Sequence, residues 1–306
     1  MNAREWLASS SAPVWDVALI GAPISRASIS PSSAHLTPAA FREGLVRFST
    51  YDGDHGVDLT DLVVRDLGDA EGDAVDGVEA AHARIEAACR AAAPDGVVVV
   101  IGGDNSLTFP AMVGCAGGAL DAGWGLLTFD AHHDVRDPAL YGGSRNGTPV
   151  RDLITAGLPG NRVVQIGLQG FANAREHHEW AVAHGVQVRR ASQVRAGGIT
   201  SVLDSAIGAL ERSGAERFYV DFDLDVLDRS YAPACPASMP GGLTPVDLEE
   251  AAYMLGADPR VLAVDLAEVD AAADVAGITV HTMCAVFLSF CAGMSHRRRL
   301  QSEALA

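Results

Sequence analysis

Eight short apolar runs recur along the chain, and they constrain its fold more than any other feature of the sequence. Each run has the length of a β-strand, and its hydrophobicity is continuous rather than alternating, which is typical of strands covered on both faces. The runs are Val14–Ile20, Leu62–Arg65, Val97–Ile101, Trp124–Phe129, Arg162–Ile166, Val186–Val188, Arg217–Val220 and Val261–Leu266. Strands of this kind are expected in a parallel sheet that lies between layers of helices.

Helical patterns lie between several of these runs. In one pattern Val78, Ala81, Ile85 and Cys89 share a face. The others, several of which open with Pro or a capping Ser, Thr or Asn, are Pro38–Phe48, Pro149–Ala156, Asn173–Ala183, Ser201–Ser213 and Pro245–Leu255. Strands alternating with helices require right-handed crossovers, so the sequence predicts a three-layer α/β/α fold with a central, mainly parallel sheet of roughly eight strands. No repeat or linker interrupts the pattern, and we expect residues 1–306 to form a single domain.

The acidic balance of the chain bears on its partners. Lys and Arg occupy 22 positions and Asp and Glu 39, which gives a net charge of −17, so nucleic acid and anionic membranes would repel the protein. We therefore expect a small-molecule partner. The five cysteines form no CxxC pair, and no apolar segment begins at Met1, so we expect reduced thiols, no secretory signal and a cytoplasmic location.

One segment invites a membrane interpretation. Residues Val275 to Met294 carry no formal charge and are followed by three arginines at 297–299, as in a membrane-spanning helix. Five polar or small residues dilute the segment, namely Gly277, Thr279, His281, Thr282 and Ser289. We interpret it as a helix buried in the core of an α/β domain.

Polar residues follow two of the predicted strands, at the end of the sheet where ligands bind in such folds. Asp130, His132 and Asp134 stand at alternate positions after Trp124–Phe129, and they would project to one side if the backbone stayed extended. Asp221, Asp223 and Asp225 form a second alternating set after Arg217–Val220. Either triplet alone is more typical of a solvated strand end, but their joint occurrence after parallel strands favours a metal site.

Oxygen ligands with one imidazole suit Mn²⁺ better than a structural Zn²⁺ site, for which thiolates are expected. Two ions that share carboxylates can lower the pKa of water to about 7. A third element, Gly102 to Ser106, follows Val97–Ile101, and its glycines allow the backbone to pass close to a ligand. By itself this element is also typical of a plain turn from a strand into a helix.

Together the three elements resemble the arginase, agmatinase and formimidoylglutamase family. That family has a GGDHS-like turn, a DAHxD strand end and a later DxDxxDP run, which correspond here to residues 102–106, 130–134 and 223–228. Residues 232–236 and 241–244 also match its AP…GGL stretch. The resemblance implies an arginase-like fold, a Mn²⁺ site with one or two ions, and a homo-oligomer, either a trimer or a hexamer.

The resemblance also implies roles for the matching residues. Asp130 and Asp223 correspond to bridging carboxylates, His132 and Asp225 to ligands of one ion, and Asp134 to a ligand of the other. Asp134 or Asp225 would also help to move a proton in catalysis. Glu268 stands after Val261–Leu266, where the family keeps an acid that pairs with the amidinium or guanidinium of the substrate.

Three positions bear on the substrate. Asn105 replaces the histidine of the GGDHS-like turn, and an amide oxygen is a weak, neutral metal ligand. Asn146 replaces the histidine of an HGTP-like run, so the proton-shuttling imidazole of arginases and agmatinases is missing. Arg136 follows DAHxD by two places, as in formimidoylglutamases, and it could hold a substrate carboxylate or form a surface ion pair with Asp137.

We therefore predict a hydrolase that converts N-formimidoyl-L-glutamate to L-glutamate and formamide, with Arg136 and Asn146 binding the substrate. An agmatinase or another guanidino-acid hydrolase is the alternative among enzymes. A catalytically silent binding or regulatory subunit is the alternative of another class. Four histidines lack ligand spacing to the motifs, and we interpret them as structural; they are His177, His178, His281 and His296.

Overall fold

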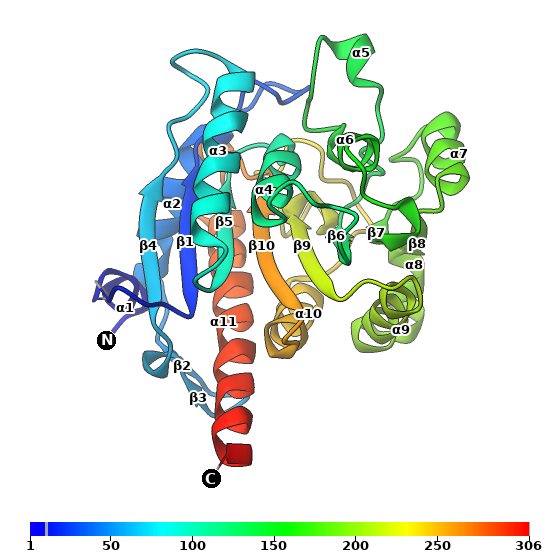
Figure 1. Cartoon of the computed structure of the whole chain (residues 1–306). Helices are drawn as coiled ribbons and strands as arrows, with labels where there is room; N and C mark the ends of the chain where they lie inside the picture. The colour runs from blue at the N-terminus through cyan, green and yellow to red at the C-terminus, as the bar shows by residue number, and fades with distance from the viewer. Residues whose placement is uncertain (10–11, 306) are drawn as a thin grey trace.

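The computed structural model describes residues 1–9 and 12–305, and its centre is one eight-stranded sheet (Figure 1). The strands are β1 Val17–Ala22, β4 Val64–Asp69, β5 Val97–Gly102, β6 Trp124–Phe129, β7 Val163–Leu168, β8 Gln187–Arg190, β9 Arg217–Asp223 and β10 Val261–Ala267. They run parallel in the order β4-β1-β5-β10-β9-β6-β7-β8. The predicted sheet is confirmed, with all eight runs as strands.

Helices cover both faces of the sheet, as the three-layer prediction requires. One face packs against α3 Val78–Ala92, α4 Thr108–Cys115, α6 Pro149–Thr155 and α7 Arg175–Ala183. The other face packs against α1 Ala3–Ser9, α2 Thr37–Gly44, α8 Ala191–Gly197, α9 Ile199–Arg212, α10 Pro245–Ala257 and α11 Ile278–Leu305. The short helix α5 Pro138–Tyr141 lies beyond the end of the sheet, at the top of Figure 1.

Single turns of 3₁₀ helix connect several elements. They are η1 Ala34–Leu36, η2 Leu45–Arg47, η3 Leu59–Asp61, η4 Asn105–Leu107, η5 Gly160–Arg162, η6 Leu224–Val226 and η7 Ala271–Ala273. Two of them carry residues of the predicted site: η6 follows β9 directly, and η4 follows β5 after Gly103 and Asp104.

Helix α11 contains the uncharged segment that invited a membrane interpretation. Within Ile278–Arg299, an 18-residue window has a mean hydropathy of 1.6, and 72% of that window is buried inside the fold. Its Phe287 ring meets the Phe41 ring of α2 edge-on at 5.3 Å between centroids. This burial agrees with the predicted core helix.

Some elements differ from the prediction. The helix expected over Pro38–Phe48 ends as an α-helix at Gly44 and continues as η2. Gly44 has Cys284 and Val280 of α11 at 3.0 and 3.1 Å from the position of a β-carbon, so close contact with α11 fixes this end. Helix α1 and a small antiparallel hairpin, β2 Tyr51–Asp52 with β3 Val57–Asp58, were not predicted, because each is too short for a periodic apolar pattern.

Candidate metal centre and substrate cavity

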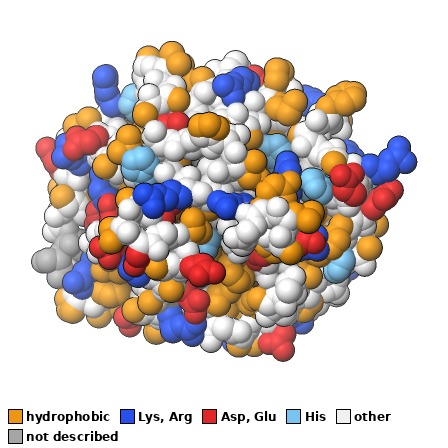
Figure 2. Space-filling view, turned by 90° about the horizontal axis from the view of Figure 1, so that it is seen from above, with side chains coloured by type: hydrophobic (Ala, Val, Ile, Leu, Met, Phe, Trp, Pro, Cys, Tyr) orange, Lys and Arg blue, Asp and Glu red, His pale blue; other side chains and the backbone are white. Residues whose placement is uncertain are grey.

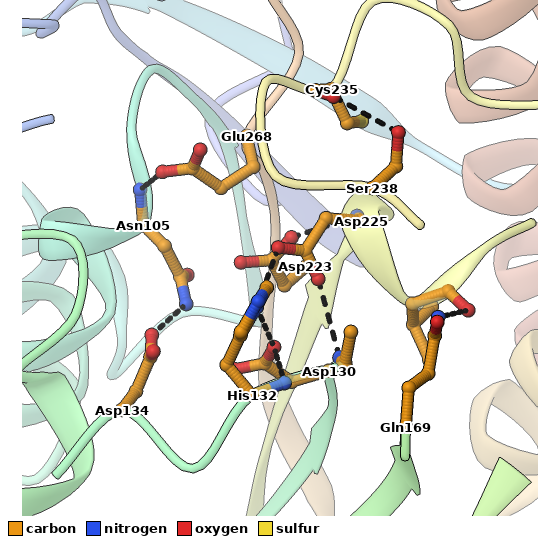
Figure 3. A network of polar contacts seen from close by, with 12 residues as sticks. Asn105, Asp130, His132, Asp134, Gln169, Asp223, Asp225, Cys235, Ser238 and Glu268 are labelled. Atoms are coloured by element: carbon orange, nitrogen blue, oxygen red, sulfur yellow. Dashed lines mark hydrogen bonds and ion pairs between the residues drawn. The ribbon is translucent and has the colours of Figure 1, made fainter. Parts of the chain in front are cut away.

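The two acidic motifs meet because strands β6 and β9 are neighbours. Their register pairs Phe129 with Phe222, so the next residues along each strand, Asp130 and Asp223, lie side by side at the carboxyl end of the sheet. The five candidate ligands, which we call the acidic cluster, are Asp130, His132, Asp134, Asp223 and Asp225 (Figure 3).

Two groups within the acidic cluster can each hold a metal ion. Asp130, His132 and Asp225 form one group, and Asp130, Asp134 and Asp223 form the other. Within each group, one ligand atom of every residue lies within 4.8 Å of the others. Asp130 belongs to both groups, which is the arrangement expected of a carboxylate that bridges two ions.

The backbone reaches this arrangement by turns that follow the strands. Strand β6 ends at Phe129, and the Asp130 carboxylate accepts a hydrogen bond from the His132 amide at 2.6 Å. The Asp223 carboxylate accepts one from the Asp225 amide at 2.8 Å, where η6 begins. Asp134 has a φ of 50°, a left-handed conformation that costs a non-glycine residue about 1–2 kcal/mol. The expected convergence is therefore present; the backbone is extended through Asp223 in β9, but it does not stay extended after Phe129 in β6.

His132 carries the only basic side chain of the acidic cluster. Its Nδ1 lies 2.9 Å from Asp225 Oδ2 and 3.4 Å from Asp130 Oδ1. Burial lowers the pKa of His132, but the charges of Asp225 and Asp130 outweigh this effect and raise it to about 12. Burial by itself would raise the pKa of Asp225, whereas the pairing with His132 holds that pKa below its ordinary value.

The other three carboxyls have no comparable compensation from the protein. Burial, and then the neighbouring carboxylates, raise the pKa values of Asp130 and Asp223 well above their ordinary range. Burial raises the pKa of Asp134 to about 7, although His132 opposes it. Asp130 Oδ2 is buried without a hydrogen-bond partner among the described residues. An orphaned carboxylate oxygen inside a group of acids fits a divalent cation, since oxygen donors with one imidazole suit Mn²⁺.

Glu268 borders the acidic cluster at the end of β10 (Figure 3). Its Oε1 accepts hydrogen bonds from the Asn105 amide at 2.7 Å and from Asn146 Nδ2 at 2.9 Å. Burial, with a smaller contribution from Asp104, raises the pKa of Glu268 to about 8. Its φ of 66° is a second left-handed conformation at this site, as is common where structure is constrained by function.

The two asparagines that replace family histidines are both engaged within the protein. Asn105 Nδ2 donates to Asp134 Oδ2 at 3.1 Å, and its Oδ1 accepts from Thr108 at 2.9 Å. The side-chain oxygen of Asn105 would therefore have to turn toward the acidic cluster to bind a metal. Asn146 donates to Glu268 and accepts a hydrogen bond from the Ile29 amide at 2.9 Å.

Arg136 lies beside the acidic cluster and forms no ion pair among the described residues. Asp137, its alternative partner, pairs instead with Arg151 at 2.9 Å. The guanidinium of Arg136 donates to the Tyr141 hydroxyl at 2.8 Å. Its backbone amide donates to the Gly147 carbonyl at 2.9 Å, and a β-carbon at Gly147 would lie 2.8 Å from Arg136 Cδ. The turn at residues 146–148 thus contacts the backbone and the Cδ of Arg136, while Tyr141 holds its guanidinium.

A cavity opens above the acidic cluster. Its floor includes His132, Asp134, Asp223, Asp225 and Glu268, and its wall includes Arg136, Asn146, Asn173 and His177. The structure therefore brings all the predicted site residues together, and all of them line the cavity except Asp130 and Asn105, which are buried beneath it.

Two histidines near the acidic cluster have different surroundings. His133 points away from the acidic cluster, and its Nδ1 lies 2.7 Å from Gln165 Oε1. His177 was interpreted as structural but lies in the wall of the cavity. The position of His177 after β7, at the same edge of the sheet as the motifs, indicates that it can reach the site. Its spacing from the motifs along the sequence does not.

Comparisons with known proteins agree with this geometry. The model of the arginase family matches residues 15–293. A formimidoylglutamase from Halalkalibacterium halodurans is 38% identical over 279 residues, which cover 90% of this chain and 86% of that protein. The crystal structure of formimidoylglutamase from Bacillus subtilis superimposes with a TM-score of 0.88 at 31% identity, covering 94% of this chain and 89% of that one.

A second solved structure bears on the metal. The formiminoglutamase of Trypanosoma cruzi, crystallised with Mn²⁺, superimposes with a TM-score of 0.84 at 27% identity. The alignment covers 95% of this chain and 98% of that one. The family model matches most of the chain, the relatives are similar over nearly its whole length, and the fold is shared. This chain therefore belongs to the arginase family.

Proposed function

We propose that this protein is a manganese-dependent hydrolase that cleaves N-formimidoyl-L-glutamate to L-glutamate and formamide. The observation that carries the proposal is Arg136, a guanidinium without an ion pair among the described residues, held in the wall of a cavity whose floor is the acidic cluster. The formimidoylglutamases from Halalkalibacterium halodurans and Bacillus subtilis support the same reaction.

The acidic cluster would hold the metal. Asp130, His132 and Asp225 would bind one Mn²⁺, and Asp134, Asp223 and the shared carboxylate Asp130 would bind a second. When bound, such ions act as Lewis acids and lower the pKa of water to about 7. Whether one ion or two would bind depends on Asn105, because the side-chain nitrogen of Asn105, and not its oxygen, faces Asp134.

Glu268 would hold the amidinium of the substrate. Its Oε1 is fixed by the Asn105 amide and Asn146, which leaves Oε2 to accept an N–H of the amidinium. The positive charge of the substrate favours the ionised form of this buried carboxyl, which is why an amidine suits the site. Asp134 or Asp225 would move the proton that reaches the leaving nitrogen. Asn146 would thus contribute to substrate binding by positioning Glu268.

Arg136 favours an amidine that carries a carboxylate over a cationic guanidine. A guanidinium fork can hold a carboxylate through two parallel hydrogen bonds, whereas the ammonium group of agmatine would be repelled. The agmatinase alternative is therefore not favoured. A silent subunit is not favoured either, because five buried or half-buried ligand residues have been retained, and buried acids are costly when no cation compensates them.

Replacement of Arg136 tests the proposed reaction. We expect Arg136→Ala to lower kcat/KM for N-formimidoyl-L-glutamate by about 100-fold, mainly through KM, since charge-assisted hydrogen bonds contribute about 1.5–3 kcal/mol each. Arg189→Ala, on the edge strand β8 and outside the cavity lining, is the matched control. The manganese content of both variants should equal that of the wild type. A change in kcat/KM below about threefold would rule out the carboxylate contact.

The assembly and location of the protein stay predictions. The family resemblance suggests a trimer or hexamer, and the cysteine usage suggests the cytoplasm.

A further inference from the structure

The substrate of the proposed reaction carries two carboxylates, but the proposed function assigns a partner to only one. Of the described residues that line the cavity, those with a basic side chain are His132, Arg136 and His177. His132 is paired with Asp225 in the acidic cluster, so it cannot serve a second anion. His177 is the basic residue that remains.

The His177 side chain is placed to meet a ligand. It is half-buried in the cavity wall, and its ring has no hydrogen-bond partner among the described residues. The adjacent His178 differs, because its Nδ1 lies 3.2 Å from His133 Nε2, inside the protein. Burial, and then the charge of Arg136, lower the pKa of His177. The ring is therefore largely neutral at pH 7, and its N–H can donate one hydrogen bond.

The segment that carries His177 is fixed relative to the acidic cluster. Asn173 Oδ1 accepts a hydrogen bond from the His133 amide at 2.8 Å, and its Nδ2 donates to the Ala131 carbonyl at 2.9 Å. Both contacts are to residues that flank His132. The His177 amide donates to the Ala174 carbonyl at 3.2 Å, one turn into α7. The backbone that carries the His177 imidazole is thus anchored to the segment that contains His132.

The surface around the cavity suits an anion despite the acidity of the chain. Helices α5 and α6 lie toward the upper side of Figure 1, and Figure 2 shows the molecule from that side. Basic and histidine side chains lie near the middle of this face. This distribution contrasts with the net charge of −17 and would draw an anionic ligand toward the site.

We propose that His177 is a specificity residue that donates a hydrogen bond to the second carboxylate of the substrate, while Arg136 holds the first. The inference rests on the proposed function and deepens it, because it makes the cavity selective for linear amidines with two acid groups. His177 acts by binding the substrate and takes no part in the acidic cluster.

The test uses stable amides in place of the amidine. N-formyl-L-glutamate carries both carboxylates, N-formyl-L-glutamine lacks that of the side chain, and 4-formamidobutanoate lacks that next to the nitrogen. Dissociation constants are measured by calorimetry on the manganese-loaded wild type, His177→Leu, His177→Gln and Arg136→Ala. His184→Gln, an exposed histidine at the end of α7, is the control.

We expect His177→Leu to weaken binding of N-formyl-L-glutamate roughly 10- to 100-fold, the effect of one hydrogen bond to a charged group. One of the two mono-acids lacks the carboxylate that His177 holds. His177→Leu should bind that mono-acid as tightly as the wild type does. Arg136→Ala should weaken binding through the other carboxylate instead, so the mono-acid that is unaffected by His177→Leu should be the one that Arg136→Ala binds less tightly. His177→Gln should retain part of the affinity for N-formyl-L-glutamate. Equal effects of His177→Leu on all three ligands, or none on any, would overturn the proposal.

The reaction and the anion site can fail independently. Wild-type binding of N-formyl-L-glutamate that depends on His177, without hydrolysis of N-formimidoyl-L-glutamate, would retain the anion site and reject the reaction. If His177→Leu hydrolyses N-formimidoyl-L-glutamate as well as the wild type does, the reaction is retained and the anion site is rejected. Absence of wild-type binding would also reject the anion site. Circular dichroism of each variant guards against misfolding.

Discussion

Replacement of Asp134 by Asn should stabilise the metal-free protein and destabilise the manganese-loaded one. In the metal-free protein, Asp134 is a carboxyl whose pKa is raised from 3.8 to about 7, mainly by burial. The folded state then binds a proton more tightly than the unfolded state, so ionisation of Asp134 costs stability. Asn occupies the same volume and cannot ionise.

The magnitude follows from the two pKa values. Each pKa unit corresponds to about 1.4 kcal/mol, and the pKa of Asp134 changes from 3.8 to about 7. The contribution of Asp134 to stability is favourable below about pH 4 and is lost progressively as the pH rises to about 7. Relative to the wild type, Asp134→Asn should gain about 1.4 kcal/mol for each pH unit in this window, and on the order of 4 kcal/mol above it.

Urea unfolding at pH 5, 6, 7 and 8 measures this difference. One series contains a chelator, and the other contains an excess of Mn²⁺. Comparing the variant with the wild type at each pH cancels the other titrating groups, such as the buried His82 and His133. With Mn²⁺ the sign should reverse, because binding to the folded state stabilises it and Asn supplies a weaker ligand than a carboxylate.

A metal-free variant that is no more stable than the wild type at pH 8 would refute this reasoning. That result would mean that the charge of Asp134 is compensated within the protein. The acidic cluster would then be no argument for a cation.

Three further substitutions probe the cavity. Asn146→Ala removes a donor to Glu268, and we expect at least a tenfold lower kcat/KM for N-formimidoyl-L-glutamate, with manganese content by atomic absorption unchanged. Gly147→Ala places a β-carbon 2.8 Å from Arg136 Cδ, so KM for this substrate should rise. Gly197→Ala is the control, because a β-carbon there meets nothing within 4 Å, and KM should be unchanged. Glu268→Gln removes the charge that pairs with the amidinium, and stopped-flow or steady-state rates should show kcat lowered about 100-fold.

The sheet could be predicted because its strands are buried on both faces. A continuous apolar run such as Val97–Ile101 has few alternatives to a central strand, and eight such runs alternate with helical patterns. The site could be located because parallel strands place their carboxyl ends at one edge. The side-by-side position of Asp130 and Asp223 then follows once β6 and β9 are neighbours.

The finer geometry depends on contacts between residues far apart in the chain. Asn146 is 122 positions from Glu268, and Asn105 is 163 positions from it. No local pattern indicates that both asparagines would hold the same carboxylate oxygen. The left-handed backbone of Glu268 is likewise imposed by the surroundings, since glutamate, unlike aspartate, is not enriched in this conformation. His177 reaches the cavity through the fold of the segment after β7.

The most direct test of the proposed reaction compares four substrates on the manganese-loaded protein. They are N-formimidoyl-L-glutamate, agmatine, arginine and 4-guanidinobutyrate, with release of formamide and urea quantified for each. Asp130→Ala, which removes the carboxylate common to both ligand groups, is the blank. We expect formamide from N-formimidoyl-L-glutamate alone and no product with Asp130→Ala. Urea from a guanidino substrate, or no product from any of the four, would contradict the proposed function.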